Sequence, residues 1–306
     1  MMKRILKILI LLLIPLSSSA QMTPLKSQYV LNPLVLNPAS AGNMGVLNVT
    51  AFYRKQWVGV KGAPETMTLT ADAPFSDNRM GLGMIFTSDR VGVTKESHFM
   101  ANYSYKVPVG KGTLSFGLGA GITVTNTAWS KLIVLDPEDD FILIDSKGFV
   151  VPGFSFGTFY SDNNFFAAVS IPKLLGYKYD FGKSKYVVNN NMGEYYYLLN
   201  TGYLFNLSPY LKFMPSALIA FSPGDKVLYD VNAHFRIMDR FWAGAAYRNN
   251  RSLVGLFQIQ LNDQIRFGYT YDYDFAKLQT YSSGSHEIML RYEFRYKVQA
   301  ISPLNF

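Results

Sequence analysis

The 306-residue sequence contains no cysteine, which excludes disulfide bonds, thiolate metal sites and cysteine nucleophiles. It is also poor in charge, since only 16% of its residues are charged, against about 25% in an ordinary soluble domain. Beyond the N-terminus it lacks any run of the roughly 18 to 20 apolar residues that a spanning helix needs, which excludes a polytopic helical membrane protein. With 49% hydrophobic and 15% aromatic residues, it is too apolar for a disordered chain. The composition therefore predicts a β-rich protein.

The first 20 residues are typical of a signal peptide. Lys3, Arg4 and Lys7 form a basic start, residues 8–16 an apolar stretch, and residues 18–20 a small-residue cleavage site. Removal of these three basic residues lowers the formal net charge from +8 to +5, which does not indicate nucleic-acid binding. An exported, cysteine-free, β-rich chain with 21 Tyr and 23 Phe is typical of a bacterial outer-membrane barrel.

Strand-like segments follow one another along the rest of the chain. In each segment, apolar residues alternate with polar or small ones, as in strands that face lipid on one side and a lumen on the other. The last segment carries five charges in one register and none in the other, and this face must point inward because a lipid-facing Arg or Lys costs about 2–4 kcal/mol. We therefore predict an all-β fold, a transmembrane antiparallel outer-membrane β-barrel of about 14 strands over residues 47–297. The strands are expected at residues 47–57, 66–72, 81–87, 97–107, 113–123, 150–160, 164–171, 195–205, 210–221, 227–236, 241–248, 253–261, 265–272 and 286–297.

The connections between these segments alternate in length, as barrels with short periplasmic turns and longer extracellular loops require. With the mature N-terminus in the periplasm, the periplasmic turns are predicted at residues 73–80, 108–112, 161–163, 206–209, 237–240 and 262–264. The extracellular loops are predicted at residues 58–65, 88–96, 124–149, 172–194, 222–226, 249–252 and 273–285.

A barrel of this size needs something to fill it. Strands about 4.8 Å apart and tilted by about 40° would form a cylinder roughly 28 Å across, which side chains alone cannot fill. Residues 21–46 are expected to form an N-terminal plug, or else a loose periplasmic segment, since prolines interrupt any helix there. Residues 298–306 form a C-terminal extension past the last strand. The candidates for lining the lumen or holding the plug are Arg54, Gln56, Asp230, His234, Arg236, Arg266, Asp272, Glu287, Arg291 and Glu293.

No group of residues in the sequence points to catalysis or to a bound cofactor. His98, His234 and His286 lie on separate predicted strands, without the paired spacing of a metal site. Ser285, His286 and Glu287 are adjacent on one predicted strand, so their side chains alternate between its faces and cannot converge as a triad. We therefore expect a protein that is not an enzyme and that uses no metal or cofactor.

Two predicted extracellular loops carry residues suited to binding. An acidic cluster in the longest loop would form either a calcium site or a solvated loop face; its members are Asp136, Glu138, Asp139, Asp140 and Asp145. Tyrosine and lysine alternate within residues 173–191, which suits contact with another protein or a glycan, unless the rings belong to the membrane-interface girdle. The candidates for contact with a partner or cargo are Tyr177, Lys178, Tyr179, Phe181, Lys183, Lys185 and Tyr186.

The chain also resembles a known family through short motifs that run in order along it. The N-terminal motifs are the more specific ones, and the later ones carry weight through their order. They are Gln28-Tyr29, Asn37-Pro38-Ala39, Tyr53-Arg54-Lys55-Gln56-Trp57-Val58-Gly59, Gly62-Ala63-Pro64-Glu65-Thr66, Asp72-Ala73-Pro74, Tyr247-Arg248, Gly268-Tyr269-Thr270-Tyr271-Asp272 and Gly284-Ser285-His286-Glu287. In these residues the chain is similar to the PorP/SprF family, outer-membrane proteins of the type IX secretion system of Bacteroidota.

This resemblance implies a non-enzymatic component of the secretion and gliding machinery, located in the outer membrane. Such a protein would help secrete or tether large surface proteins such as adhesins, by engaging their C-terminal sorting domain. Its partners would be that cargo, periplasmic or lipoprotein parts of the machinery, and membrane lipid, but no nucleic acid. The alternative is a substrate-conducting barrel resembling fatty-acid transporters, which are also fourteen-stranded with an N-terminal plug.

Overall fold

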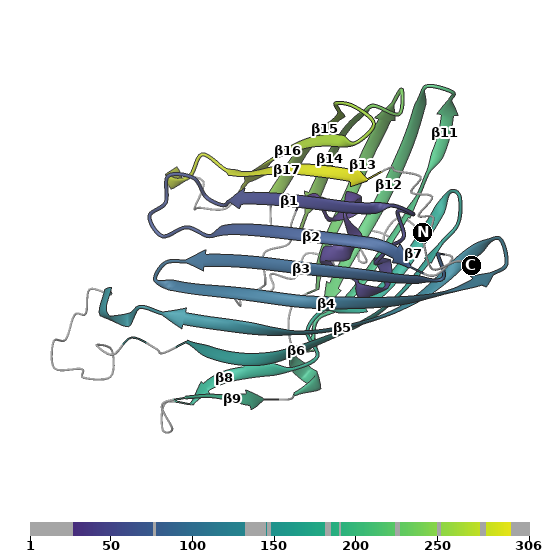
Figure 1. Cartoon of the computed structure of the whole chain (residues 1–306). Coiled ribbons are helices and arrows are strands. Elements are labelled where there is room, and N and C mark those ends of the chain that lie inside the picture. The colour runs from purple at the N-terminus through teal and green to yellow at the C-terminus, as the bar shows by residue number, and fades with distance from the viewer. Residues whose placement is uncertain are drawn as a thin grey trace, which may run out of the picture.

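A computed structural model describes residues 27–75, 78–131, 145, 148–180, 185–189, 191–223, 227–249, 252–275 and 280–294. The predicted signal peptide and the C-terminal extension lie outside the described residues. The described chain forms an antiparallel β-barrel around a short N-terminal segment (Figure 1). Among these residues, no helix is long and apolar enough to cross a bilayer.

All paired strands run antiparallel, and most of them are joined to the next by a hairpin connection. Their bounds are β1 (Leu47–Lys55), β2 (Glu65–Phe75), β3 (Met80–Val91), β4 (Thr94–Val109), β5 (Gly112–Thr127), β6 (Phe149–Ser161), β7 (Phe165–Ile171), β8 (Gly176–Asp180), β9 (Lys185–Asn189), β10 (Tyr197–Tyr203), β11 (Phe205–Ser208), β12 (Leu211–Phe221), β13 (Leu228–Ile237), β14 (Phe241–Arg248), β15 (Ser252–Gln260), β16 (Ile265–Asp274) and β17 (Ser285–Phe294).

The barrel closes through the pairing of its first and last strands. β1 pairs with β17 over its whole length, from Leu47 opposite Phe294 to Lys55 opposite His286. β10 and β11 both pair with β12 and are separated only at Leu204, so they form two parts of one wall strand, and the fifteen-stranded sheet makes a barrel of 14. β8 and β9 form a separate two-stranded hairpin within the connection from β7 to β10. The predicted fold class and strand number are confirmed.

Burial alternates along the wall strands as the sequence pattern predicts. On β17, Glu287 and Arg291 are 0% and 1% exposed, whereas Leu290 between them is 52% exposed. The charged side chains therefore face the lumen, and the apolar ones form the outer surface that lipid would cover. Arg295 and Lys297, which continue this register in the sequence, lie outside the described residues.

The two ends of the barrel differ in their connections, and we name them accordingly. The short-turn end carries the connections at residues 76–79, 110–111, 162–164, 209–210, 238–240 and 261–264. The long-loop end carries those at residues 56–64, 92–93, 128–148, 172–196, 222–227, 249–251 and 275–284. One predicted loop is wrong: residues 88–96 are mostly strand, because β3 and β4 extend and pair as far as Val91 opposite Thr94. The segment 172–194 is likewise not a plain loop, since it holds the β8–β9 hairpin.

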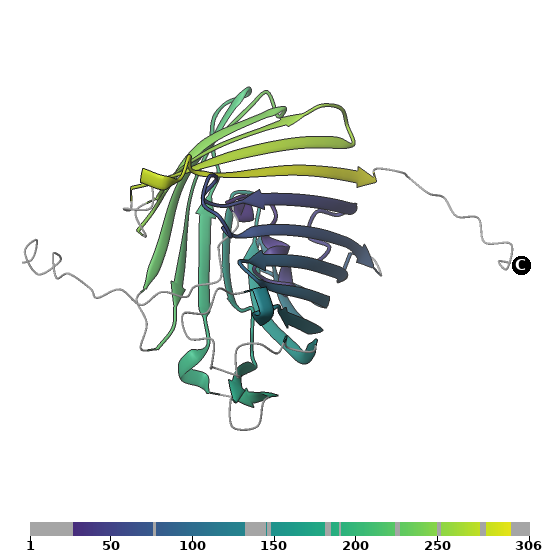
Figure 2. The same ribbon diagram turned by 90° about the vertical axis from the view of Figure 1, so that its left-hand side faces the viewer.

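A segment of three single-turn 3-10 helices lies inside the ring of strands (Figure 2). These are η1 (Tyr29–Leu31), η2 (Pro33–Val35) and η3 (Pro38–Ser40). Proline at the first position of η2 and η3 starts each turn, because its fixed φ suits a helix start and its missing N–H needs no partner there. We call residues 27–46 the plug segment.

Candidate functional site

Most of the plug segment is as buried as a protein core, although Met44 near its end is 41% exposed. Tyr29, Ala39 and Ala41 are fully buried, and Leu34 is 3% exposed. Tyr29 packs in a cluster with Leu198, Leu218 and Ala220 from two wall strands; their side chains point inward. Burial raises the pKa of the Tyr29 phenol above its usual value, and nearby Asp230 raises it further. The hydroxyl of Tyr29 accepts a hydrogen bond from Asn232 Nδ2 at 2.8 Å.

The first residues of the plug segment are bound by carboxylates near the long-loop end. The backbone N–H groups of Ser27 and Gln28 donate to the two oxygens of Glu287, at 3.2 and 3.1 Å. The Ser27 hydroxyl donates to Asp272 at 2.9 Å. Asp272 and Glu287 lie near the long-loop ends of β16 and β17, so the described chain begins at that end of the lumen and runs toward the short-turn end.

Two buried arginines hold these carboxylates in place. Arg54 Nη2 lies 2.6 Å from Asp272 Oδ2, and Arg54 Nη1 lies 3.4 Å from Glu287 Oε2. Arg248 bridges Asp230 at 2.8 Å and Asp272 at 3.1 Å. Both arginines also donate to the Ser27 hydroxyl oxygen, at 2.9 and 3.2 Å. We call Arg54, Asp230, Arg248, Asp272 and Glu287 the latch; charge-assisted bonds of this kind are about twice as strong as neutral ones.

Further contacts fix the rest of the plug segment along the lumen. Asn32 donates to Thr70 at 3.0 Å, and Arg291 donates to the Leu31 carbonyl at 2.5 Å. Asn37 caps η3 by accepting from Ala39 N–H at 2.9 Å, and its amide donates to the Thr158 carbonyl at 2.9 Å. Nearer the short-turn end, the backbone of Gly42 is bound on both sides, by Asp72 at 2.8 Å and by Lys106 at 2.6 Å.

Glycines in the wall let the plug backbone approach closely. A Cβ atom at Gly117 would overlap the backbone of Pro38 and Ala39, and one at Gly81 would overlap the Ala41 carbonyl. A side chain at either position would therefore displace the plug segment.

The predicted lumen residues fall into three groups. Arg54, Asp272, Glu287 and Arg291 contact the plug segment directly, and Asp230 acts through Arg248. A cavity between the plug segment and the wall at the short-turn end is lined by a second group: His234, Arg236, Arg266 and Glu293. Gln56 stands apart, half-buried just beyond the end of β1.

Arg236 lines this cavity at the rim of the lumen, where its side chain is 37% exposed. It lies 2.9 Å from Asp239, which also accepts from Lys212 at 3.0 Å. The hydrogen bond from Lys212 and the charges of Lys212 and Arg236 lower the pKa of Asp239. Asp239 is in the β13–β14 turn, where it and Met238 have φ values of +54° and +52°.

The predicted contact residues of the loop 173–191 fall largely on the β8–β9 hairpin. Tyr177 is opposite Val188 and Tyr179 is opposite Tyr186 in its ladder. Phe181 and Lys183 lie outside the described residues, as do Asp136, Glu138, Asp139 and Asp140 of the acidic cluster. Asp145 accepts a hydrogen bond from Ser130 N–H at 2.9 Å. Within the described ranges, no three His, Asp or Glu side chains gather as metal ligands would.

Several residues of the site were not identified by the sequence analysis. Arg248 is the last residue of β14 and occupies an inward position, as do Trp242, Gly244 and Ala246. The alternation of residues along β14 is therefore a sequence signal for Arg248. The roles of Asn37 and Asp72 depend on the path of the plug backbone, for which the sequence carries no periodic signal.

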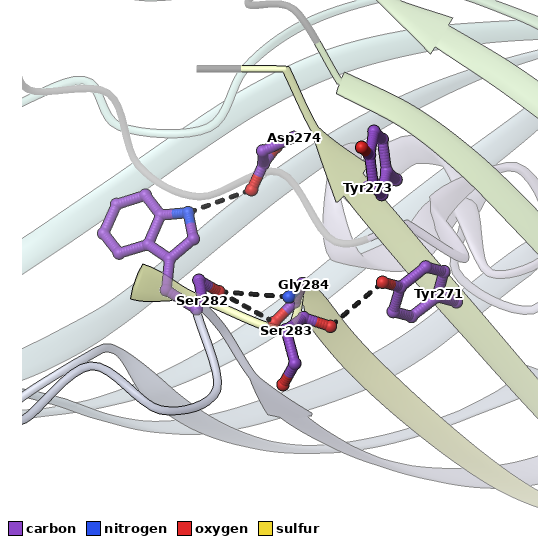
Figure 3. A pocket seen from close by; sticks show the side chains of 7 residues that line it. Tyr271, Tyr273, Asp274, Ser282, Ser283 and Gly284 are labelled. Atoms are coloured by element: carbon purple, nitrogen blue, oxygen red, sulfur yellow. Dashed lines mark hydrogen bonds between the residues drawn. The ribbon is translucent and has the colours of Figure 1, made fainter. Parts of the chain in front are cut away.

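A small cavity of about 210 Å³ also opens at the long-loop end (Figure 3). Trp57 Nε1 donates to Asp274 at 3.0 Å across it, and Tyr271 donates to the Ser283 carbonyl at 2.9 Å. Trp57 has a φ of +45°, an unfavourable conformation for a bulky residue. Val58 N–H donates to the Gly284 carbonyl and Ser283 N–H donates to the Val58 carbonyl, both at 2.9 Å, so the β1–β2 and β16–β17 connections are tied together above the closure of the barrel.

A closed barrel with an apolar outer surface and a charged, filled lumen defines an outer-membrane β-barrel protein. A family model described as "Type IX secretion system membrane protein PorP/SprF" matches residues 18–292, and the chain belongs to this family. It is therefore a membrane component of the type IX secretion system. The resemblance seen in the sequence motifs is confirmed.

Similar solved structures are outer-membrane barrels of low sequence identity. The monoaromatic hydrocarbon channel CymD is 13% identical, covers 90% of this chain and 94% of its own, and has a TM-score of 0.51. Omp33 of Acinetobacter baumannii is 10% identical over 82% of this chain and 100% of its own, with a TM-score of 0.48. The toluene transporter TbuX of Ralstonia pickettii is 11% identical over 86% of this chain and 93% of its own, with a TM-score of 0.47. No curated protein matches the chain. At these identities the likeness concerns the fold alone.

Proposed function

We propose that this protein is a plugged outer-membrane barrel that tethers or helps secrete large surface proteins, adhesins in particular, by engaging their C-terminal sorting domain. It would be exported by its signal peptide and act, without catalysis, in the secretion and gliding machinery of a member of the Bacteroidota. The observation that carries the proposal is the anchored plug segment. A lumen whose contents are held by the latch is suited to a docking platform rather than to a conduit.

In this proposal the long-loop end faces the cell surface and the short-turn end faces the periplasm. This orientation follows the usual distribution of long and short connections in such barrels. Cargo would then meet the long-loop end, and the periplasmic or lipoprotein parts of the machinery would meet the short turns. The charged group of Lys212, Arg236 and Asp239 at the short-turn end offers such a partner a polar contact.

The β8–β9 hairpin is the element that we propose for cargo contact. It extends away from the wall at the long-loop end (Figure 1). Within the described chain β8 and β9 pair only with each other, so each strand has a free edge. A free edge can accept a strand from another protein, while side chains on its faces provide specificity.

The test is deletion of residues 173–191, replaced by a short glycine-serine linker. We expect barrel insertion to be unchanged and display of the adhesin on the cell surface to be abolished. A second variant keeps the hairpin but changes its three tyrosines to serine and its lysines to glutamine. The matched control is Tyr281→Ser, which removes a 75% exposed tyrosine from another connection at the same end. Normal display in both hairpin variants would contradict the proposal.

Conductance in planar bilayers separates this function from that of a channel. We expect the wild-type protein to remain closed, because the latch holds the plug segment across the lumen. A stable open current, or uptake of hydrophobic substrates that depends on the barrel, would instead favour the conducting alternative.

A further inference from the structure

The cavity at the short-turn end is larger than the packing of the plug requires. It has a volume of about 840 Å³, within the range of about 300–1,000 Å³ that is usual for small-molecule sites. One side is formed by the plug segment, through Val30, Leu31 and residues 44–46. The other side is formed by the wall, from β7, β12, β13, β14, β16 and β17 and from Leu204 between β10 and β11. We call it the inner chamber.

The lining of the inner chamber has an apolar part and a cationic part. The apolar part includes Leu31, Met44, Phe166, Leu204 and Met214. Unbranched methionines adapt their shape to what they contact, which suits an occupant with a flexible chain.

The cationic part is built around Trp242. The Arg266 guanidinium lies 4.1 Å from the ring centroid of Trp242 and that of Arg236 lies 5.3 Å away. Arg291 also lines the chamber, and its Nη1 has only a weak contact with Met44 Sδ at 3.6 Å. Of the three guanidinium groups in the lining, that of Arg236 lies 2.9 Å from Asp239 and that of Arg266 lies 3.5 Å from Glu293, whereas Arg291 makes no ion pair among the described residues.

One buried polar group in the lining has no partner. His234 is 2% exposed, and its Nδ1 atom has no hydrogen bond to any described residue. An unpaired buried polar atom costs about 1–3 kcal/mol, so such an atom beside an open chamber points to a ligand.

We propose that the inner chamber binds the carboxylate of a fatty acid, with the head group at Arg236, Arg291 and His234 and the chain along the apolar part. A peptide fits less well, because the lining strands β13, β14 and β16 are paired on both sides and would leave its backbone N–H and C=O groups unsatisfied. A fatty acid brings only one polar end, and its charge would pair with Arg291, which makes no ion pair in the part of the chain that the structure describes. This site is independent of the docking function, because it lies at the opposite end of the lumen from the hairpin.

The test is titration of dodecanoate into the full-length barrel in non-ionic detergent, followed by calorimetry and corrected with empty micelles. We expect saturable binding, and binding of dodecan-1-ol at least about tenfold weaker, since the alcohol lacks the charge that the arginines bind. His234→Phe and Arg236→Gln should each weaken dodecanoate binding by about fivefold or more. Met214→Trp should weaken binding, because the larger ring would narrow the apolar part of the chamber.

The matched control is Arg240→Gln, which removes an exposed arginine from the β13–β14 turn at the same rim but outside the chamber. It should bind dodecanoate like the wild type. Heat-modifiable migration in gels checks that each variant forms a closed barrel. The proposal is wrong if binding is not saturable, if the alcohol binds as well as the acid, or if His234→Phe and Met214→Trp both bind like the wild type.

Discussion

The latch can be tested by removing one charge, with the substitution Glu287→Gln. Glu287 is fully buried and accepts hydrogen bonds from Ser27 N–H, Gln28 N–H and Arg54. Glutamine has nearly the same volume, but one of its two terminal atoms is an NH₂ donor. That donor would face a backbone N–H group or the Arg54 guanidinium, so at least one of the three bonds is lost.

The magnitude follows from the partners that remain. Hydrogen bonds to charged groups contribute about 1.5–3 kcal/mol, and breaking a buried ion pair costs up to about 3–5 kcal/mol. The upper value does not apply here, because Arg54 keeps Asp272 at 2.6 Å. We therefore expect the attachment of residues 27–31 to weaken by about 2–3 kcal/mol, which raises the detached fraction by roughly 30- to 150-fold.

Hydrogen exchange measures this fraction directly, since amide exchange follows local opening. Amides of residues 27–31 should exchange roughly 30- to 150-fold faster in Glu287→Gln, and planar bilayers should show transient openings. The matched control is Glu65→Gln, because that carboxylate bonds Tyr53 on the outer surface of the same end of the barrel. If exchange in Glu287→Gln stays within about twofold of the wild type while the barrel inserts normally, the latch does not hold the plug segment.

Two further predictions concern the lumen wall and the short-turn end. Gly117→Val should still insert as a complete barrel but give a stable open current in planar bilayers, because the new side chain overlaps the backbone of Ala39. The control is Gly255→Ala, whose Cβ would meet no atom within 4 Å and which should give no such current. Asp239→Asn should lower the thermal midpoint slightly at pH 7 and by less near pH 2.5, measured by circular dichroism. The reason is that the pKa of Asp239 is lower in the folded protein than its ordinary value of about 3.9. The carboxylate therefore stabilises the fold above pH of about 3.9, and this contribution is lost as the pH falls through the lowered pKa. Equal destabilisation by Asp239→Asn at both pH values would contradict this sign.

The wall of the barrel was predictable because lipid imposes a strict rule on it. Where a strand crosses the apolar layer, every second side chain must be apolar, and Leu290 beside Arg291 on β17 follows this rule. The extension of β3 and β4 beyond the predicted strands was not predictable in this way. There Asp89 pairs opposite Glu96 and Arg90 opposite Lys95. Beyond the lipid layer apolar and polar residues no longer alternate, so the sequence of such a polar stretch resembles that of a loop.

The contacts of the plug segment were only partly predictable. Alternation on β1, β16 and β17 identified Arg54, Asp272 and Glu287 as inward residues. Their convergence on Ser27 could not be read from it, because it depends on the tilt of the strands and on the irregular path of η1 to η3. The exposed position of Arg236 has a similar cause, since it lies one residue from the end of β13, where the lumen opens to solvent.

The use of charge in the latch has its own physical logic. An apolar plug would fill the lumen at least as stably, because burying charges is expensive and well-packed hydrophobic replacements of buried ion pairs are often neutral or stabilising. The charges fix the register of the plug segment in the lumen. Glu287 binds the N–H groups of Ser27 and Gln28 and no other pair of the segment, whereas apolar contacts would tolerate a shift of the segment along the lumen. A latch of ion pairs can also be released by a competing charge without unfolding the barrel wall. We therefore expect the combined substitution of Arg54, Asp272 and Glu287 by leucine or methionine to keep the thermal midpoint of the barrel, while exchange of the plug amides becomes fast and heterogeneous. A plug that stayed uniformly protected in that variant would show that packing alone sets its register.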